Sequence, residues 1–249
     1  MKRDFASRAE LAGYLAAQFP DLPGPVSPIR GGRAEAELKL SDSDPAAYGF
    51  SRNYLDSKVT GLSPYIRHGV LLLAEARDHA FAMAAHPFHV SKFIAELAWR
   101  DYWQRLYWEW GAGVWEDREA YKTGLESADY ADEIPDDVRE GRTGLACMDA
   151  FASDLTDTGY VHNHARMWHA AYIVHWRRVK WQAGARWYLE HLLDGDAASN
   201  NLSWQWVAST FSHRPYLFDR ANLEKYTKGR FCSGCPARER CPFERRPYD

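Results

Sequence analysis

The chain has 249 residues, of which 46% are hydrophobic, and its formal net charge is −3. That length can bury a sizeable core, which we expect to form one large domain, and no apolar run approaches the roughly 20 residues that span a bilayer. With no signal-like stretch after Met1, the sequence predicts a cytoplasmic protein with no membrane partner, and its charge excludes a global electrostatic attraction to nucleic acid.

The first predicted element is a helix over residues 8–19, where apolar residues recur at helical spacing. Four prolines and the pair Gly31-Gly32 follow, so residues 20–33 should form a connector. A further helix should begin at Ser63, with the hydroxyl as its cap and proline at the first helical position.

The longest predicted helix ends at Trp110, because Gly111 and Gly113 follow it. A more polar loop should cover residues 112–142. No alternating strand pattern of convincing length is present, so the predicted fold class is all-α. The apolar stripe of the long helix consists of Val90, Phe93, Ile94, Leu97 and Ala98, and later helices are predicted over 145–157, 163–182, 184–193 and 198–210.

The most informative segment runs from Asp194 to Trp206 and reads DGDAASNNLSWQW. It places carboxylates, amides and indoles within a few helical turns. Taken alone, it could be an ordinary loop and helix whose asparagines cap the backbone. Four other segments occur in order before it: TGLSPY at 60–65, ELAWRDY at 96–102, GRTG with MDA within 141–150, and GYVHNHARM at 159–167.

Together these five segments resemble the FAD-binding helical domain of the photolyase/cryptochrome family, over about residues 48–220. The resemblance implies a division into an N-terminal helix and connector (1–47), the FAD-binding domain (48–226) and a cysteine-containing tail packed on it (227–249). Only about fifty residues precede the flavin segments, without a βαβ pattern. We therefore expect no N-terminal α/β antenna domain and no antenna chromophore. Its loss would expose apolar surface on which a homodimer could form.

The resemblance also implies roles around the flavin. Thr60 and Ser63, with backbone N–H groups at a helix start, would hold the pyrophosphate, and Arg100 would add a cation. Asn200 would face flavin N5, and a neutral amide there resembles photolyases more than plant cryptochromes. The implied cofactor-binding residues are Thr60, Gly61, Leu62, Ser63, Phe93, Glu96, Arg100, Asn163, Arg166, Asp194, Gly195, Asp196 and Asn200, with Arg166 paired to Asp194 and Asp196 near the pyrimidine edge.

Trp204 and Trp181 match the first two members of the family's electron-transfer chain. The third position falls on Ala128, with Tyr121 and Tyr130 nearby. Photoreduction would then end on a tyrosine, take another route or be impaired.

Five residues match those that contact a flipped pyrimidine dimer in cyclobutane-dimer photolyases. Their carboxylate and amide can hydrogen-bond base edges, and their indoles can flank extruded bases. The predicted lesion residues are Glu96, Trp99, Asn163, Met167 and Trp206, and the predicted catalytic set is Trp204, Trp181, Glu96 and Asn163.

The chain has four cysteines, and the close spacing of three of them in the tail suggests a metal rather than disulfides in a cytosolic protein. They are Cys147 and the tail cysteines Cys232, Cys235 and Cys241. The spacing resembles iron-sulfur bacterial cryptochromes and photolyases, in which such a set binds a [4Fe-4S] cluster, although the gap before Cys241 is shorter here. A zinc site or unligated thiols would use the same residues.

The resemblance leads to the hypothesis of a blue-light-driven deoxyribodipyrimidine photo-lyase, acting on UV-damaged DNA, single-stranded or duplex. In this reaction reduced FAD donates an electron to a pyrimidine dimer. A cryptochrome-like photoreceptor or flavin redox protein without repair activity is the alternative. A purely structural flavin module is a third, less favoured because structure alone would not require Trp204 beside Trp181.

Overall fold

The computed structural model describes residues 2–21, 26–57 and 59–248. Within these ranges there is no named strand, and the one isolated β-bridge joins Ala131 to Val179. The all-α prediction is therefore confirmed. Among the same residues, no helix is long and apolar enough to cross a bilayer.

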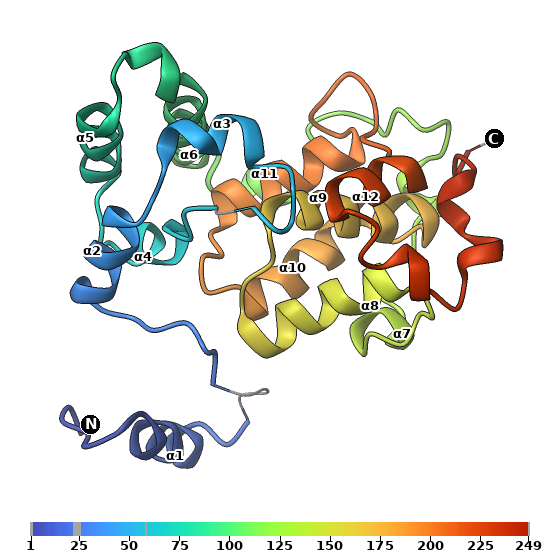
Figure 1. Cartoon of the computed structure of the whole chain (residues 1–249). Helices are drawn as coiled ribbons and strands as arrows, with labels where there is room; N and C mark the ends of the chain where they lie inside the picture. Colours follow the sequence, from blue (N-terminus) through green and yellow to red (C-terminus); the bar gives the residue numbers. More distant parts are fainter. Residues whose placement is uncertain (1, 22–25, 58, 249) are drawn as a thin grey trace.

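The N-terminal helix α1 (Arg8–Gln18) lies apart from the other helices (Figure 1) and buries none of its side chains. Ser7 caps it by accepting a hydrogen bond from the backbone N–H of Glu10. The helix was predicted correctly, but its apolar positions Leu11 and Leu15 remain 36% and 39% exposed. Part of the predicted connector, residues 22–25, lies outside the described ranges.

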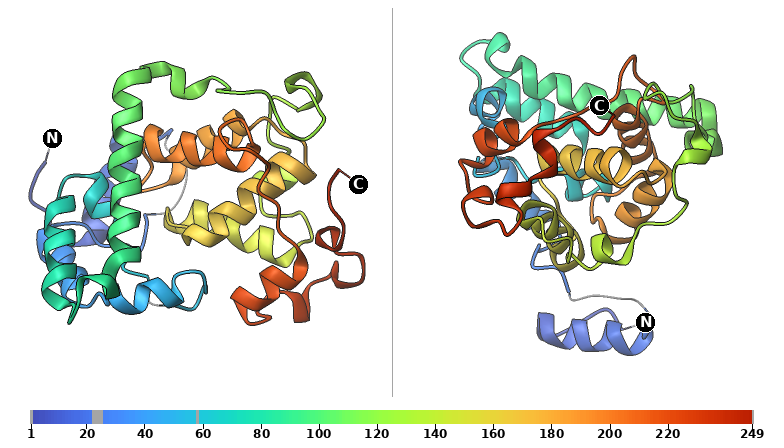
Figure 2. Two further views of the ribbon diagram at one scale, coloured as in Figure 1. Left: turned by 90° about the horizontal axis from the view of Figure 1, so that it is seen from above. Right: turned by 90° about the vertical axis from the view of Figure 1, so that its right-hand side faces the viewer.

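A first group of helices packs around its own small core, and the long helix α6 borders it (Figure 2). Buried members of that core include Leu62, Tyr65, Leu71 and Phe93. The group consists of α2 (Arg33–Ser41), α3 (Pro45–Ser51), α4 (Ser63–Arg67), α5 (Leu73–Met83), the 3-10 turn η1 (Pro87–Val90) and α6 (Ser91–Trp110).

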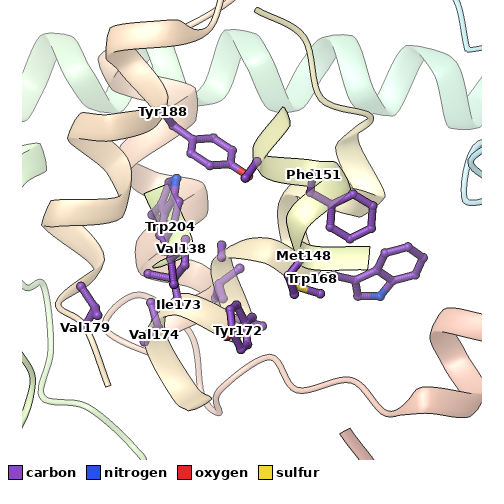
Figure 3. Close-up of a cluster of buried hydrophobic side chains, with 14 of the residues drawn as sticks. Val138, Met148, Phe151, Trp168, Tyr172, Ile173, Val174, Val179, Tyr188 and Trp204 are labelled. Carbon is purple, nitrogen blue, oxygen red and sulfur yellow. The ribbon is translucent and has the colours of Figure 1, made fainter. Parts of the chain in front are cut away.

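A second, larger group follows, and its core is shown in Figure 3. Its aromatic and sulfur-containing side chains, such as Met148, Phe151, Trp168 and Trp204, are almost completely buried. The group contains η2 (Gly111–Trp115), η3 (Ser127–Asp129), α7 (Asp136–Arg139), α8 (Ala146–Ser153), η4 (Asp154–Thr158), α9 (Asn163–Ala171), η5 (Tyr172–Trp176), α10 (Trp181–His191), α11 (Ala197–Ala208), α12 (Arg220–Thr227), η6 (Cys232–Gly234), η7 (Arg238–Arg240) and η8 (Pro242–Glu244).

Two local predictions were wrong. The helix expected over 163–182 is interrupted after Trp176, because Arg178 takes a positive φ of 51° and the chain pairs with Ala131 before α10 begins at Trp181. At α4, Leu62 rather than Ser63 holds the cap position, and no side chain caps the helix. Helix periodicity does not predict the interruption, because it depends on pairing with Ala131 from elsewhere in the chain. The difference at α4 is a shift of one residue in where the helix begins.

The tail is held by aromatic contacts. Phe243 is 2% exposed, and its ring lies against Phe218, Tyr172 and Trp176 at centroid distances of 4.6, 5.9 and 5.2 Å. The Trp176 indole donates to the Pro242 carbonyl at 3.1 Å. These aromatic contacts and this hydrogen bond attach the tail to the second helix group.

Candidate functional site

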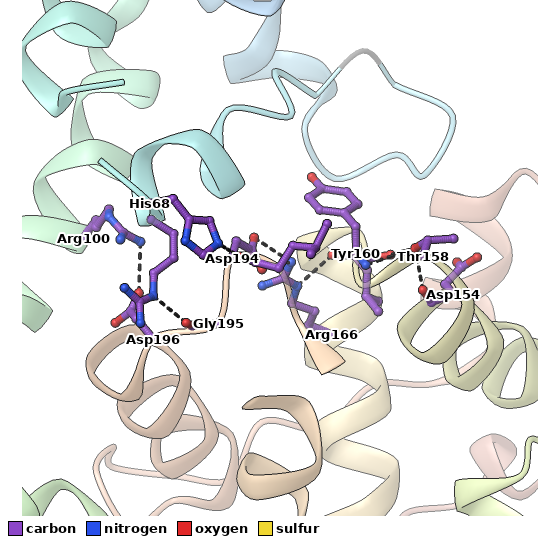
Figure 4. Close-up of polar contacts among 12 residues, drawn as sticks. His68, Arg100, Asp154, Thr158, Tyr160, Arg166, Asp194, Gly195 and Asp196 are labelled. Atoms are coloured by element: carbon purple, nitrogen blue, oxygen red, sulfur yellow. Dashed lines mark hydrogen bonds and ion pairs between the residues drawn. The ribbon is translucent and has the colours of Figure 1, made fainter. Parts of the chain in front are cut away.

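The loop at 192–196, between α10 and α11, belongs to the second helix group and is contacted by residues of the first (Figure 4). Nε of Arg67, the last residue of α4, donates to the Gly195 carbonyl at 2.6 Å, and Nε2 of His68 lies 2.9 Å from the Leu193 carbonyl. This loop carries the two predicted carboxylates, so contacts from both groups converge on the segment that the sequence singled out.

Asp194 and Arg166 form an ion pair in which Nη2 reaches both carboxylate oxygens, at 2.9 and 3.0 Å. The Asp194 side chain is 4% exposed. Burial by itself would raise the pKa of this carboxyl, but the Arg166 guanidinium, aided by the Ser63 hydroxyl, outweighs burial and lowers it. Arg166 Nε also donates to the Val161 carbonyl at 2.7 Å. The predicted Arg166–Asp194 ion pair is therefore present in the structure, and its hydrogen bonds hold both charges in place.

Asp196 has three hydrogen-bond partners. It caps α11 by accepting from the Ser199 backbone N–H at 2.8 Å, and it accepts from Arg100 Nη1 at 3.0 Å and Gln104 Nε2 at 2.8 Å. Arg100, expected near the phosphates, therefore lies at the N-terminus of α11 beside this carboxylate. Gln104 was missed, although its place four residues after Arg100 puts both side chains on one face of α6.

The predicted phosphate-binding turn lies at the start of α4. Gly61 has a φ of 63°, a left-handed conformation that favours glycine. Leu62 is 2% exposed and belongs to the smaller core, as does Phe93, which packs edge-on against Tyr48. Both apolar residues thus serve packing, whereas Ser63 approaches Asp194 closely enough to affect its pKa.

The first turns of α11 contain polar groups suited to a bound ligand. Among the described residues, Ser199 Oγ and Asn201 Nδ2 are buried without a hydrogen-bond partner. Asn200 donates from Nδ2 to the Ala185 carbonyl at 3.0 Å. Unpartnered buried polar atoms are costly, and a ligand that supplied their partners would remove that cost. With the nearby charged pair, the donor set fits a flavin nucleotide.

The five predicted lesion residues come from α6, α9 and α11, and each retains access to solvent. Trp99 is 49% exposed and stacks on Trp103 at 5.1 Å, while Trp206 is 40% exposed and lies 5.4 Å from Tyr216. Asn163 is exposed and Met167 is half-buried. Glu96 forms ion pairs with Lys92 at 2.7 Å and Arg52 at 3.1 Å. No hydrogen bond joins any two of the five within the described residues.

The two predicted relay tryptophans lie in the α10–α11 contact. Trp204 is 3% exposed and packs edge-on against Tyr188, with ring centroids 5.2 Å apart. Trp181 is fully buried, and its Nε1 donates to Asp117 Oδ1 at 2.6 Å. Tyr121 and Tyr130 stack on each other at 4.4 Å.

All four cysteines line one small cavity of about 20 Å³, together with Arg220 and Arg238 among others. Burial raises the pKa of the Cys147 thiol and raises that of Cys232 to about 11. Within the described ranges, however, no three side chains of ligand type are grouped as a metal ion would require. The fold therefore gathers the predicted cysteines without presenting a preformed metal site.

Comparison with known proteins agrees with the fold. The family model for the FAD binding domain of DNA photolyase matches residues 93–229, which is more than half of the chain. Deoxyribodipyrimidine photo-lyases from Synechococcus and Streptomyces griseus are 29% and 34% identical, over 77% and 60% of this chain. These alignments cover only 40% and 32% of the relatives, so the chain spans well under half of their length.

Solved structures resemble the chain in the same way. An archaeal photolyase from Sulfolobus tokodaii superimposes with a TM-score of 0.66 at 26% identity, covering 88% of this chain and 49% of its own. A Synechocystis cryptochrome has a TM-score of 0.69 at 21% identity over 85% of this chain and 47% of its own, a likeness of fold. The five ordered segments, the helical fold and the family match agree, and the chain belongs to the family of photolyase FAD-binding domains.

Proposed function

We propose that the chain binds FAD at the 192–196 loop and acts as a light-driven photolyase on pyrimidine dimers in DNA. The observation that carries the proposal is the convergence of Arg166, Asp194, Arg100 and Asp196 on that loop. Arg100 comes from α6, Arg166 from α9 and the two aspartates from the connecting loop, and the resemblance assigned all four to the cofactor.

Each protein group has a definite task in this scheme. Bound FAD, when reduced and excited by light, supplies the electron that splits the dimer. The Arg166–Asp194 pair holds a fixed dipole at the cofactor, and its burial keeps the local field strong. The Asn200 amide can donate or accept a hydrogen bond but cannot supply a proton as an acid does.

The accessible aromatic side chains support a role in base recognition. Trp99 and Trp206 present large exposed ring surfaces on which extruded bases can stack, a contact worth about 1–3 kcal/mol per base. Glu96 and Asn163 offer hydrogen-bonding groups for base edges. The net charge of −3 implies that phosphate contacts would come from local arginines and lysines.

The direct test is to illuminate the reduced, FAD-loaded protein with oligonucleotides that contain a thymine dimer, single-stranded and duplex. We expect dimers to disappear, and Trp206→Ala to abolish most of the repair. Trp108→Ala is the matched control, because Trp108 is 87% exposed on α6 and lies outside the predicted set. If no dimers are lost on either strand form while FAD remains bound, the repair proposal is wrong.

A photoreceptor without repair activity is the second candidate. The observation that favours it is the Glu96 carboxylate, which already pairs with Lys92 and Arg52 instead of standing free for a base. Light-induced flavin reduction with no dimer loss, together with a change in protease sensitivity on illumination, would support this function.

We also propose that Cys147 and the three tail cysteines hold a [4Fe-4S] cluster. Its support is the shared cavity. A zinc ion and a [4Fe-4S] cluster each take four cysteine thiolates, which is the number of cysteines that line this cavity. Iron and sulfide analysis of anaerobically purified protein tests this; negligible iron would remove the cluster, and one equivalent of zinc would replace it.

A further inference from the structure

Trp115, at the end of η2, stacks on Trp181 with ring centroids 6.4 Å apart and planes inclined by only 11°. We propose that Trp115 is the outer electron donor of this protein, the residue that re-reduces Trp181 after light-driven oxidation. The inference rests on the proposed flavin function and deepens it, because it identifies where the relay meets solvent.

The inner part of the relay leads to Trp181 along α10. The Trp204 ring lies directly over Gly184, one helical turn from Trp181. Both indoles are at most 3% exposed. An external reductant therefore cannot touch either of them, and a partly exposed aromatic residue must complete the path.

Trp115 has the required access and is held firmly in place. Its side chain is half-buried, its carbonyl accepts from Gln182 Nε2 at 3.4 Å, and the Arg186 guanidinium lies 5.2 Å from its ring centroid. The preceding residue, Val114, is fully buried and accepts from Gln205 Nε2 at 3.1 Å. Hydrogen bonds from α10 and α11 thus fix η2 against the relay.

The charges around the two indoles differ. Asp117 accepts the Trp181 N–H at 2.6 Å, and a carboxylate in this position stabilises positive charge on that ring. Arg186 opposes positive charge on Trp115, but Arg186 is exposed and therefore screened by water. Once oxidised Trp115 has lost its indole proton to solvent, it is a neutral radical with no positive charge for Arg186 to oppose. The radical therefore remains on Trp115.

The tyrosines near the family's third position are poorer outer donors. Tyr121 and Tyr130 are 8% and 3% exposed, so neither offers much contact to a reductant in solution. Tyrosine oxidation also requires loss of the hydroxyl proton. The Tyr130 hydroxyl forms a hydrogen bond with the Tyr248 hydroxyl, which also bonds to Nδ1 of His175. Burial lowers the pKa of His175 to about 4, so this histidine is a weak acceptor for the proton.

One electron passes from Trp115 to oxidised Trp181, which returns to its neutral state. Trp115 then releases its Nε1 proton to water and remains as a neutral radical. A thiol in solution supplies one electron and one proton, which restores Trp115 and leaves an oxidised thiol.

Trp115→Phe tests the inference with three measurements on FAD-loaded protein and its flavin-free form. We expect photoreduction with added thiol to slow about tenfold or more in the variant. In the unsubstituted protein illuminated without thiol, we expect peptide maps to show oxidised tryptophan at position 115 that is absent in the dark. The near-ultraviolet circular dichroism of the flavin-free variant should differ from that of the unsubstituted protein only by the loss of the stacked-indole signal. Trp110→Phe is the matched control, because Trp110 is half-buried and lies 4.1 Å from the Arg118 guanidinium.

The outcomes separate the two proposals. If Trp204→Phe blocks photoreduction but Trp115→Phe proceeds at the rate of Trp110→Phe, Trp115 is not the outer donor and the flavin proposal stands. If Tyr121→Phe or Tyr130→Phe slows the reaction instead, the relay ends on a tyrosine. A chain that binds no flavin would overturn the proposed function and the relay with it.

Discussion

The indole of Trp204 fills the space that a side chain at Gly184 would occupy, since a Cβ atom at Gly184 would lie 2.2 Å from Cη2 of that ring. Glycine is therefore required in the middle of α10, despite its poor helix propensity, so that α11 can bring Trp204 close to Trp181. The packing of the two helices and the predicted relay depend on the same contact.

Gly184→Ala should displace Trp204 and lower the free energy of unfolding by about 1–3 kcal/mol, because overpacking outweighs the gain in helix propensity. Urea denaturation followed by far-ultraviolet circular dichroism measures this. Gly13→Ala in α1 is the control, because nothing lies within 4 Å of its added methyl group. Equal effects of the two substitutions would show that the Trp204 contact is not tight.

Asp194→Asn should cost about 3–5 kcal/mol of unfolding free energy, since it leaves the Arg166 guanidinium without its buried counter-charge. FAD content, measured as flavin absorbance per protein near about 450 nm, should fall as well. The double variant Arg166→Met with Asp194→Leu should recover much of the stability but not the flavin. Full flavin content in the double variant would contradict a role for the pair in binding.

Acid should destabilise the protein through buried neutral histidines. Burial lowers the pKa of His169 to about 3 and that of His175 to about 4, both below the unfolded value of 6.5. The unfolded chain therefore binds protons first, and stability is lost as the pH falls from about 6.5 towards those values, by about 2 kcal/mol per histidine at about pH 5.

His169→Phe removes one buried titrating group. The free energy of unfolding should therefore fall less between pH 7 and pH 5 in this variant than in the unsubstituted protein, even if the substitution changes stability at pH 7. Urea titrations at the two pH values measure it. His213→Gln is the control, since His213 is exposed. An unchanged pH dependence in His169→Phe would mean that other groups dominate acid unfolding.

Phe243→Ala should release the tail, because its ring packs against Phe218, Tyr172 and Trp176. We expect a loss of about 3–5 kcal/mol and rapid cleavage after Thr227 in limited proteolysis. Phe50→Ala, at a position 88% exposed, should change neither. If the tail remains protected in the Phe243 variant, the cysteine cavity rather than this ring is its anchor.

Much of the fold could be predicted from local pattern. The apolar stripe and the glycines after Trp110 predict α6 almost residue by residue, because helix periodicity and C-terminal glycine act within a few residues of each other. The interruption before Trp181 could not be predicted this way. It depends on Arg178 adopting a positive φ while Ala131, far away in sequence, pairs with this segment.

The sequence by itself determined the family, the all-α class and the Arg166–Asp194 pair, because these depend on which residues are present and in what order. Only the tertiary structure brought Arg67, His68 and Gln104 to the 192–196 loop and stacked Trp115 on Trp181. Those contacts join residues from separate helices, and their distances are set by how α6, α10 and α11 pack. No local rule of spacing or propensity specifies that packing.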